Sequence, residues 1–408
     1  MIRWNVLLVC ASVAAICILP APGLAQAPPN TDRAGAVQAE GPPVSREVLP
    51  DRRVTFRLNA PRASQVALNF QACNAQPQPM TKYEKGVWST TVGPVEPEIY
   101  SYTFLIDGVR TPDPLNSIDK NGTQLSGTQF EVPGTPPRFD ELQNVPHGSV
   151  NIHFYTSSAQ ERQRAMYIYV PPQYYSEPSR KFPVLYLWHG GGGIESDWSR
   201  NGRAGIILDN LIAEKKAVPM IVVMQSNNVL VPVQGGNVGS SKVLEKEVLN
   251  DIIPFVEKHY RSLTDRPNRA IAGLSAGGGT SFNVGMRRLE MFAYLGEFSS
   301  GLFGGTGATP APGVEQGEGG QGGGTGYGAY EPDKIAPGIY QNLVSPAKKL
   351  KIFWMSVGTE DLRLPYQKRA LKDFQKHGIQ PIFKTYPGAH EWKVWHHSLA
   401  EFAPLLFR

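Results

Sequence analysis

The feature that most constrains the fold is a set of continuous apolar runs in the C-terminal two thirds of the chain. They cover residues 183–188, 220–224, 269–274 and 352–357. Unbroken apolar runs of this length are typical of strands that are buried on both faces. Between them lie segments with helical spacing of apolar residues, at 204–214, 244–259 and 371–377. Buried strands that alternate with helices predict βαβ units and a mostly parallel central sheet. Pro254 is expected to kink or shorten its helix.

The preceding part of the chain has a different pattern. Short runs alternate between apolar and polar residues at 54–58, 66–70, 87–92, 99–104 and 130–132. Turn signals such as Asp107-Gly108 separate them. Evenly spaced short strands with such turns predict a small immunoglobulin-like β-sandwich over residues 48–134. The Pro- and Gly-rich stretch 133–137 marks the expected boundary, and the α/β domain is expected over 140–408.

The N-terminus has the features of an export signal. Arg3 supplies a positive charge, residues 6–19 form an apolar run, and small residues follow Pro20. This pattern predicts a signal peptide over residues 1–25, with an uncleaved anchor as the alternative. The mature protein is then expected in the periplasm or outside the cell, without a membrane partner. Residues 26–47 are rich in Pro, Ala, Gln and Gly, which predicts a disordered linker.

Charge and cysteine content exclude several classes of function. The 40 Lys and Arg residues of this 408-residue chain are interspersed with 35 Asp and Glu residues, so nucleic acid is not an expected partner. Cys10 and Cys17 fall within the predicted signal peptide, which leaves Cys73 alone. We therefore expect neither an intramolecular disulfide nor a Cys-rich zinc site, and no metal or other cofactor is predicted. The oligomeric state is not indicated by the sequence.

One segment interrupts the α/β pattern. Residues 301–330 are dominated by glycine and contain only two charged residues, Glu315 and Glu318. Such a segment has too few large apolar side chains to pack a core. We interpret it as a mobile surface insertion, with a catalytic lid as the alternative.

The sequence Gly273-Leu274-Ser275-Ala276-Gly277 matches the G-x-S-x-G motif. It follows an apolar strand and precedes a stretch compatible with a helix, which is the context of a nucleophile elbow. Ser275 is therefore the predicted nucleophile, and a plain Gly-rich turn is the alternative. The run His189-Gly190-Gly191-Gly192-Gly193 follows another strand and is of the type that supplies an oxyanion hole. The backbone N–H groups of Ala276 and of Gly191 or Gly192 are the expected donors.

A serine nucleophile needs a base and an acid, which follow the serine in this class of hydrolases. Asp361 comes just after the strand at 352–357 and is the predicted acid, with Glu360 as the alternative. His390 follows the strand at 382–386 and is the predicted base. The remaining histidines after Ser275 have structural explanations: His377 lies at a helix end, and His396 and His397 lie within the final helix.

Residues 140–408 resemble the esterase D and feruloyl esterase branch of the α/β-hydrolase superfamily, which enterochelin esterases share. The resemblance lies in residues 186–193 with Trp198, in 272–278, 358–361 and 388–392, and in 403–407 at the C-terminus. Residues 48–134 are similar to the carbohydrate-binding family 48 and early-set sandwiches that precede such esterases. The resemblance implies an α/β-hydrolase fold and the roles given above for Ser275, Asp361 and His390. The family has Gly-Gly-His where this chain has Gly388-Ala389-His390.

Three functions follow from these observations. The first is an exported serine carboxylester hydrolase that removes feruloyl or acetyl groups from plant cell-wall polysaccharide, with Trp198 and Trp392 as candidate substrate-binding residues. The second is a siderophore trilactone esterase, for which Arg200, Arg203, Arg363, Lys368 and Arg369 would supply positive charge. The third is a non-catalytic carbohydrate-binding surface protein. The expected partner in the first case is an ester-bearing small molecule or polysaccharide.

Overall fold

The structure is a computed structural model that describes residues 45–408, except 71, 73–75, 121, 301–331 and 347. The predicted signal peptide, most of the predicted linker, Cys73 and the Gly-rich segment 301–330 lie outside the described residues. Residues 43–408 group into one compact unit. Among the described helices, none is both long and apolar enough to cross a lipid bilayer.

An eight-stranded sheet forms the centre of the C-terminal part, in the order β10-β11-β13-β12-β14-β15-β16-β17. β10 and β11 pair antiparallel with each other, β11 pairs antiparallel with β13, and the remaining pairs are parallel. The predicted fold class, an α/β-hydrolase with a mostly parallel sheet, is confirmed. The strands are β10 (Ser149–Ser157), β11 (Arg162–Val170), β12 (Val184–Trp188), β13 (Ile221–Gln225), β14 (Arg269–Leu274), β15 (Tyr294–Phe298), β16 (Ile352–Gly358) and β17 (Ile382–Tyr386).

The four continuous apolar runs correspond to β12, β13, β14 and β16. The first three are buried along their whole length, and β16 is buried except at its first residue. β15 was not predicted, although it is equally buried and lies between β14 and β16. Gly296 and Glu297 interrupt its apolar pattern, so a strand at the centre of the sheet lacks the sequence signal that its neighbours carry.

Helices cover both faces of the sheet, and each face has its own apolar core. α3 (Ala204–Ala213) and α10 (Trp392–Phe402) pack on one face, where Phe402 is fully buried. α5 (Ile253–His259), α6 (Ala276–Arg287) and α9 (Leu364–Lys376) pack on the other, where Phe282 is fully buried. Burying one such side chain stabilises the fold by roughly 1.5–3 kcal/mol. The remaining described α-helices are α1 (Gln173–Ser176), α2 (Asp197–Arg200), α4 (Gly236–Glu247), α7 (Pro332–Ile335) and α8 (Ile339–Val344).

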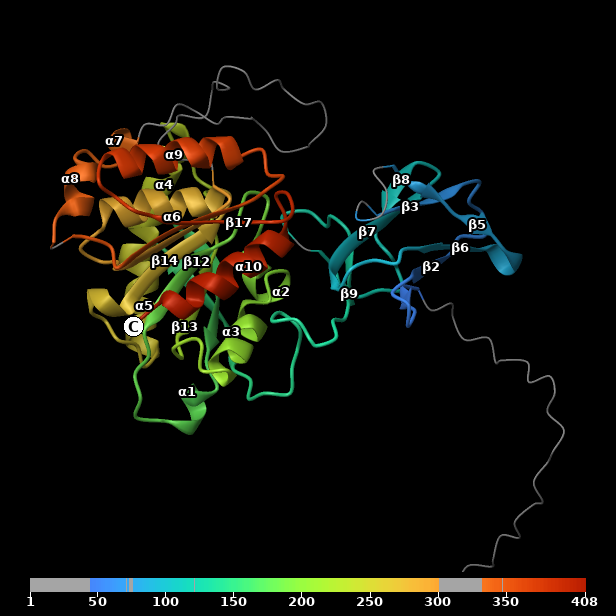
Figure 1. Cartoon of the computed structure of the whole chain (residues 1–408), viewed down its shortest axis with the longest axis horizontal. Coiled ribbons are helices and arrows are strands. Elements are labelled where there is room, and N and C mark those ends of the chain that lie inside the picture. Colours follow the sequence, from blue (N-terminus) through green and yellow to red (C-terminus); the bar gives the residue numbers. More distant parts are fainter. Residues whose placement is uncertain (1–44, 71, 73–75, 121, 301–331, 347) are drawn as a thin grey trace, which may run out of the picture. The chain divides into compact units, whose positions relative to one another are not determined.

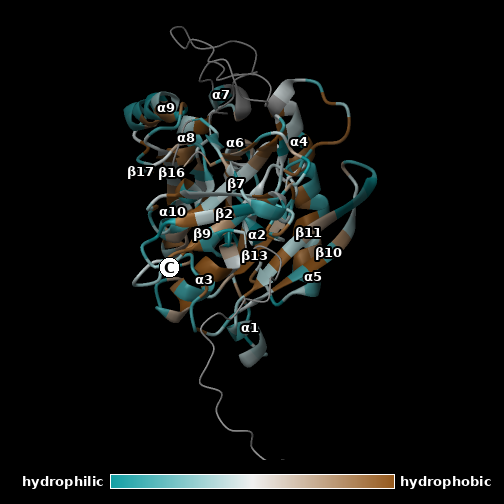
Figure 2. Cartoon of the chain, turned by 90° about the vertical axis from the view of Figure 1, so that its right-hand side faces the viewer, coloured by the Kyte–Doolittle hydropathy of each residue, from teal (hydrophilic) through white to brown (hydrophobic). Residues whose placement is uncertain are grey.

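α9 illustrates how the apolar pattern orients a helix. Tyr366, Ala370 and Phe374 recur every four residues and are buried, whereas Lys368 and Lys372 are exposed. Figure 2 shows this helix as largely hydrophilic on its outer side. As predicted, the helix ends just before Gly378, whose φ of +76° lies in the left-handed region that favours glycine.

The predicted helix around Pro254 is not broken. α4 continues through a π-helical turn at Val248–Ile252 into α5, and Pro254 lies in the first turn of α5. Proline has no backbone N–H to donate, and the wider π turn tolerates the missing hydrogen bond. The chain therefore keeps one continuous helical path, in which Val248 and Val256 are fully buried.

The N-terminal part consists of two antiparallel sheets that share one core, as the alternating pattern predicts. The first has the order β1-β2-β6-β5 and the second β4-β3-β7-β8, with β9 paired to β7. Phe56 of one sheet packs against Tyr102 and Phe130 of the other, with ring centroids 4.7 and 5.4 Å away. The strands are β1 (Glu47–Val48), β2 (Val54–Asn59), β3 (Val66–Asn69), β4 (Gln78–Pro79), β5 (Thr81–Lys82), β6 (Val87–Val92), β7 (Glu98–Ile106), β8 (Val109–Thr111) and β9 (Thr128–Val132).

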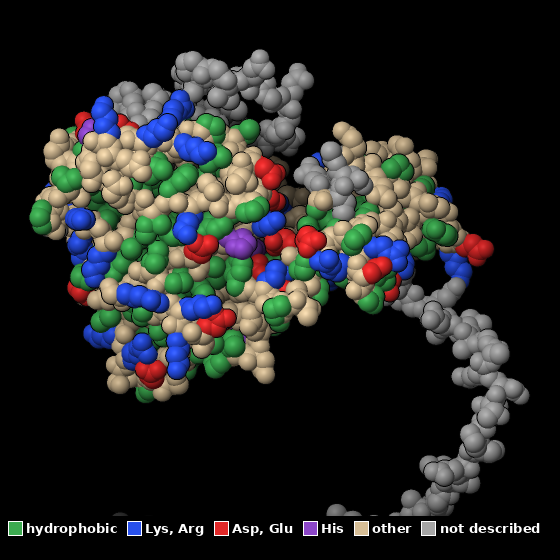
Figure 3. All heavy atoms as spheres, in the orientation of Figure 1, with side chains coloured by type: hydrophobic (Ala, Val, Ile, Leu, Met, Phe, Trp, Pro, Cys, Tyr) green, Lys and Arg blue, Asp and Glu red, His purple; other side chains and the backbone are tan. Residues whose placement is uncertain are grey.

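Lys and Arg side chains are spread over much of the face displayed in Figure 3, and Asp and Glu side chains lie among them. This mixture agrees with the interspersed charges of the sequence.

Candidate active site

Ser275 lies in a strained turn between β14 and α6. Its φ is +52° and its ψ −118°, a conformation that costs on the order of 1–3 kcal/mol for a residue with a side chain. The turn is tight because its neighbours lack side chains. A Cβ on Gly277 would lie 2.3 Å from the His189 carbonyl oxygen, and one on Gly273 would lie 2.5 Å from the Gly277 backbone. The Ser275 hydroxyl therefore reaches the surface of a cavity at the end of the strand.

The three predicted residues meet in a chain of hydrogen bonds. His390 Nε2 lies 2.9 Å from Ser275 Oγ, and His390 Nδ1 lies 2.7 Å from Asp361 Oδ2. Of the two predicted acids, Asp361 contacts the imidazole, whereas the adjacent Glu360 is exposed to solvent. Asp361 is 3% exposed, and its Oδ1 accepts hydrogen bonds from the backbone N–H and the guanidinium of Arg363.

The loops that carry Asp361 and His390 are held together by backbone contacts. β16 and β17 are parallel neighbours, so both loops leave the same edge of the sheet. The backbone N–H of Glu360 donates to the Gly388 carbonyl at 3.0 Å. Gly358 permits this approach, because a Cβ there would lie 2.2 Å from the same carbonyl oxygen.

Charge states within the triad follow from burial and from hydrogen bonding. Burial alone would raise the pKa of Asp361, but hydrogen bonding to His390 and the contacts with Arg363 lower it below its ordinary value. Burial lowers the pKa of His390, as does the charge of Arg363, while Asp361 partly opposes both. Near pH 7 the pair is therefore a carboxylate and a neutral imidazole. Nδ1–H donates to Asp361, and Nε2 can accept the hydroxyl proton of Ser275.

His189 shapes the glycine loop that faces Ser275. The backbone N–H of Asn227 donates to His189 Nε2 at 2.8 Å, so the proton of the neutral ring is on Nδ1, which donates to the Gly190 carbonyl at 2.7 Å. Burial lowers the pKa of His189 to about 4, which keeps the ring neutral. A Cβ on Gly191 would lie 3.8 Å from Ala276 Cβ, so two of the predicted oxyanion-hole positions are neighbours. The third, Gly192, has a φ of +73°.

The cavity at Ser275 has a volume of about 520 Å³, and residues from both parts of the chain line it. The Gly-rich loop, Ser275 and His390 form one side. The loop between β8 and β9 forms another, where the backbone N–H of Thr123 donates to the Gly192 carbonyl at 2.9 Å. A larger cavity of about 1120 Å³ shares Lys120, His390 and Trp392 with the first and continues along β7.

The two predicted substrate-binding tryptophans lie in different surroundings. Trp392 lines the cavity. Trp198 is 1% exposed, donates its ring N–H to the Trp188 carbonyl at 2.9 Å and packs against the edge of Trp392. Its position is that of a core residue that supports Trp392. Trp395, which was not predicted, also lines the cavity, and its ring centroid lies 4.9 Å from that of His390.

Other residues near the site carried no sequence signal. Glu297 of β15 is fully buried, and burial raises its pKa far above the ordinary value. Its two oxygens accept hydrogen bonds from Gln367 at 3.0 and 3.1 Å. Lys120 and Asp197 line the cavity, and burial raises the pKa of Asp197 to about 7. An isolated charged residue in a loop has no recognisable pattern, so only the spatial arrangement reveals these groups.

Arg363 provides a test of the electrostatics. Replacing it with glutamine removes a positive charge that lowers the pKa of His390, so we expect this pKa to rise in Arg363→Gln. NMR titration of protein with isotope-labelled histidine would measure it, with the signal assigned from its loss in His390→Gln. Arg363→Lys keeps the charge and should leave the pKa near the wild-type value. An unchanged or lower pKa in Arg363→Gln would contradict this account.

Comparisons with known proteins found related sequences and similar solved structures. The chain is 33% identical over 256 residues to an endo-1,4-β-xylanase/feruloyl esterase of Xylanibacter ruminicola, and 30% identical over 143 residues to endo-1,4-β-xylanase Y of Acetivibrio thermocellus. These matches cover 61% and 32% of this chain, but only 35% and 12% of the two relatives.

Similar solved structures include a ferulic acid esterase, which is 25% identical with a TM-score of 0.50 over 64% of this chain and 98% of that one. An enterobactin esterase from Shigella flexneri is 15% identical, with a TM-score of 0.60 over 86% of this chain and 92% of that one, and it shows the shared fold alone. Residues 157–406 match the family described as "Putative esterase". This match spans more than half of the chain, which therefore belongs to that esterase family of the α/β-hydrolase superfamily.

Proposed function

We propose that this protein is an exported serine carboxylester hydrolase that acts on feruloyl or acetyl esters of plant cell-wall polysaccharide. The observation that carries the proposal is the continuous hydrogen-bonded chain from Ser275 through His390 to Asp361, at the wall of an open cavity. Membership of the esterase family and the names of the xylanase and feruloyl esterase relatives support the reaction class.

The geometry supports a two-step acyl transfer. Ser275 Oγ attacks the ester carbonyl carbon while His390 Nε2 accepts the hydroxyl proton. Asp361 keeps the ring in the required tautomer and stabilises the imidazolium that forms. Nε2–H then protonates the departing alcohol as the ester C–O bond breaks, leaving an acyl-enzyme. A water molecule attacks this intermediate with His390 again as the base, releasing the carboxylic acid and regenerating Ser275.

Negative charge develops on the carbonyl oxygen during both steps. The backbone N–H groups of Ala276 and of Gly191 or Gly192 are our proposed donors to it, and the removal of one such donor typically costs about 10²–10³ in rate. Ala276 is also the first residue of α6, where the helix dipole favours negative charge. The hydrogen bonds of His189 fix the opposite loop in advance, so little reorganisation is needed when the charge appears.

A polymeric alcohol fits the shape of the site. The cavity at Ser275 meets the larger cavity at His390 and Trp392, and the larger one continues along the N-terminal sandwich. A small acyl group could occupy the first while the sugar chain follows the second. This arrangement gives the N-terminal part a role in holding the substrate next to the catalytic serine. Export, through the signal peptide predicted over residues 1–25, would bring the enzyme to such a polymer.

A siderophore trilactone esterase is the second candidate, since the fold of the enterobactin esterase covers both parts of this chain. Its anionic substrate would require cations at the site. However, Lys120 is the only Lys or Arg among the described residues that line the cavity at Ser275. Of the arginines considered from the sequence, Arg203 pairs with Glu131 and Arg363 pairs with Asp361. The cavity therefore favours a substrate with little negative charge.

Loss of the nucleophile tests the reaction class. We expect Ser275→Ala to lower kcat on p-nitrophenyl acetate by a factor on the order of 10⁶, and Asp361→Asn by about 10⁴ because the imidazole would lose its orientation. Glu360→Gln is the matched control and should keep nearly full activity, because Glu360 is exposed. Equal turnover by wild type and Ser275→Ala would instead favour a non-catalytic carbohydrate-binding protein.

A substrate panel distinguishes the two esterase candidates. We expect a kcat/KM at least about tenfold higher on methyl ferulate or on acetylated xylan than on ferric enterobactin, which corresponds to about 1.4 kcal/mol in transition-state binding. The physical reason is the small number of cations at the cavity. Faster hydrolysis of ferric enterobactin would reverse the choice of substrate while leaving the proposed reaction class intact.

Gly122 tests the contribution of the N-terminal part. A Cβ at this position would lie 2.5 Å from the Gly192 carbonyl oxygen, so Gly122→Ala should push the loop away from the cavity and break the Thr123–Gly192 hydrogen bonds. We expect kcat/KM on feruloylated polysaccharide to fall about tenfold, a loss of about 1.4 kcal/mol, while p-nitrophenyl acetate is affected much less. Ser117→Ala, exposed in the same loop, is the control. An equal loss on both substrates would contradict a role in polymer binding.

A further inference from the structure

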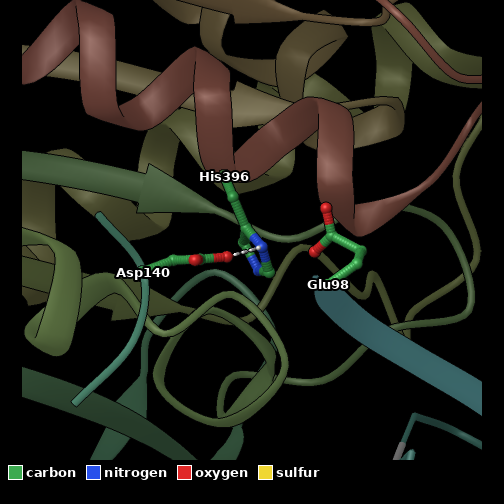
Figure 4. Close-up of side chains that lie close together, drawn as sticks. All are labelled: Glu98, Asp140 and His396. Carbon is green, nitrogen blue, oxygen red and sulfur yellow. Dashed lines mark ion pairs between the residues drawn. The ribbon is translucent and has the colours of Figure 1, made fainter. Parts of the chain in front are cut away.

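A cluster of three potential metal ligands lies outside the hydrogen-bonded chain of Ser275, and one of them, Glu98, lines the larger cavity. Glu98 comes from β7, Asp140 from the segment that joins β9 to β10, and His396 from α10 (Figure 4). One ligand atom from each lies within 4.8 Å of the other two. Asp140 and His396 are 2% and 1% exposed, and Glu98 is partly buried. Buried carboxylates are usually paired with an opposite charge or coordinate a metal.

The imidazole of His396 has one nitrogen satisfied and one not. Nε2 lies 2.9 Å from the backbone carbonyl oxygen of Asn201, which can only accept, so Nε2 carries a proton. Nδ1 lies 3.1 Å from Asp140 Oδ2, but it forms no hydrogen bond of acceptable geometry with any described residue. In a neutral ring, the Nδ1 lone pair would face a carboxylate oxygen. A positive charge between the two atoms would remove this repulsion.

Glu98 provides a third ligand on the same side. Its Oε1 accepts a hydrogen bond from the backbone N–H of Ile99 at 2.8 Å. Figure 4 shows its carboxylate directed toward the imidazole of His396. One ligand atom of Glu98 lies within 4.8 Å of those of Asp140 and His396, so the two carboxylates and the imidazole can reach one cation.

The surrounding ion pairs leave an excess of negative charge. Arg138 contacts Asp140 and Glu141 at 3.0 Å and Glu131 at 3.5 Å, and Arg203 contacts Glu131 at 3.0 Å. With Glu98 included, four carboxylates face two guanidinium groups, so two negative charges remain if His396 is neutral. A single divalent cation would balance them.

We propose that Glu98, Asp140 and His396 bind one zinc ion. An imidazole nitrogen with two carboxylate oxygens is a ligand set that suits Zn²⁺, whereas Ca²⁺ and Mg²⁺ prefer oxygen ligands alone. The 3.1 Å between Nδ1 and Oδ2 is compatible with two ligands of one ion at about 2.0–2.2 Å each. A water molecule would complete a tetrahedral set.

Outer contacts orient two of the three ligands in the way that metal sites require. Asn201 accepts from the second nitrogen of His396, and Arg138 Nε donates to the second oxygen of Asp140 at 3.0 Å. The ion would have a structural role, since it would join β7 to α10, the helix that begins two residues after His390. The sequence did not predict this site, because its ligands come from three distant segments without any metal-binding spacing.

Zinc titration of the full mature chain after removal of metal by a chelator tests the proposal. We expect one Zn²⁺ bound per chain by isothermal titration calorimetry, together with a rise in Tm. Glu98→Gln preserves shape and removes one ligand, so it should bind zinc at least about 100-fold more weakly and lose the zinc-dependent rise in Tm. Its Tm without zinc should remain at or above that of the metal-free wild type, which shows that the variant folds.

Two controls separate this site from other sites. His390→Gln removes the imidazole of the serine site and should bind zinc as tightly as the wild type. A large excess of Ca²⁺ should not displace the zinc. Absence of stoichiometric binding, or equal binding by Glu98→Gln, would overturn the proposal. Neither result depends on esterase activity, so failure here leaves the proposed function untouched.

Discussion

Close contact between backbones at the end of the central sheet is the constraint on which the candidate active site depends. Gly277 lets α6 approach the carbonyl of His189, and Gly358 lets the loop of Asp361 approach Gly388. A methyl group at either position would separate loops whose functional atoms are joined by hydrogen bonds of 2.7–2.9 Å. The relative positions of Ser275, His390 and Asp361 therefore depend on these two glycines as well as on their own side chains.

Burial then sets the protonation states that this geometry needs. His189 and His390 both have lowered pKa values because they are removed from water, and both are neutral near pH 7. The two neutral rings have different roles. His189 donates one backbone hydrogen bond and accepts another, whereas His390 directs the lone pair of Nε2 toward Ser275. Burial raises the pKa of Glu297 far above its ordinary value, and the charge of Asp361 raises it further.

The fold could be predicted wherever burial leaves a periodic signal. Continuous apolar runs identified four central strands. Ser275, Asp361 and His390, which the structure joins by hydrogen bonds, were candidates because each follows a strand. β15 was missed because Gly296 and Glu297 lie within it: the glycine packs under Phe402, and the acid is buried with Gln367 as its partner. Tertiary packing overrides the local sequence pattern in β15, which is why this strand was missed.

The candidate sites likewise contain residues that only tertiary packing brings together, so the sequence did not indicate them. Trp198 was a candidate because of a resemblance to esterases, but a resemblance does not distinguish a tryptophan that contacts substrate from one that packs against a neighbour. The loop residues Lys120 and Thr123 belong to a different part of the chain from Ser275, and no spacing rule connects them. Glu98, Asp140 and His396 are separated in the same way, so only the folded chain brings them together.

The hydrogen bonds from Thr123 to the Gly192 carbonyl limit how the N-terminal part can be deleted or exchanged. A sandwich that precedes an enzyme is commonly regarded as an accessory module that can be exchanged or deleted at the linker. Here such a deletion would also remove one wall of the cavity at Ser275 and the hydrogen bonds to the Gly192 carbonyl. A graft of the hydrolase part that is meant to keep this cavity should therefore carry the β8–β9 loop with it.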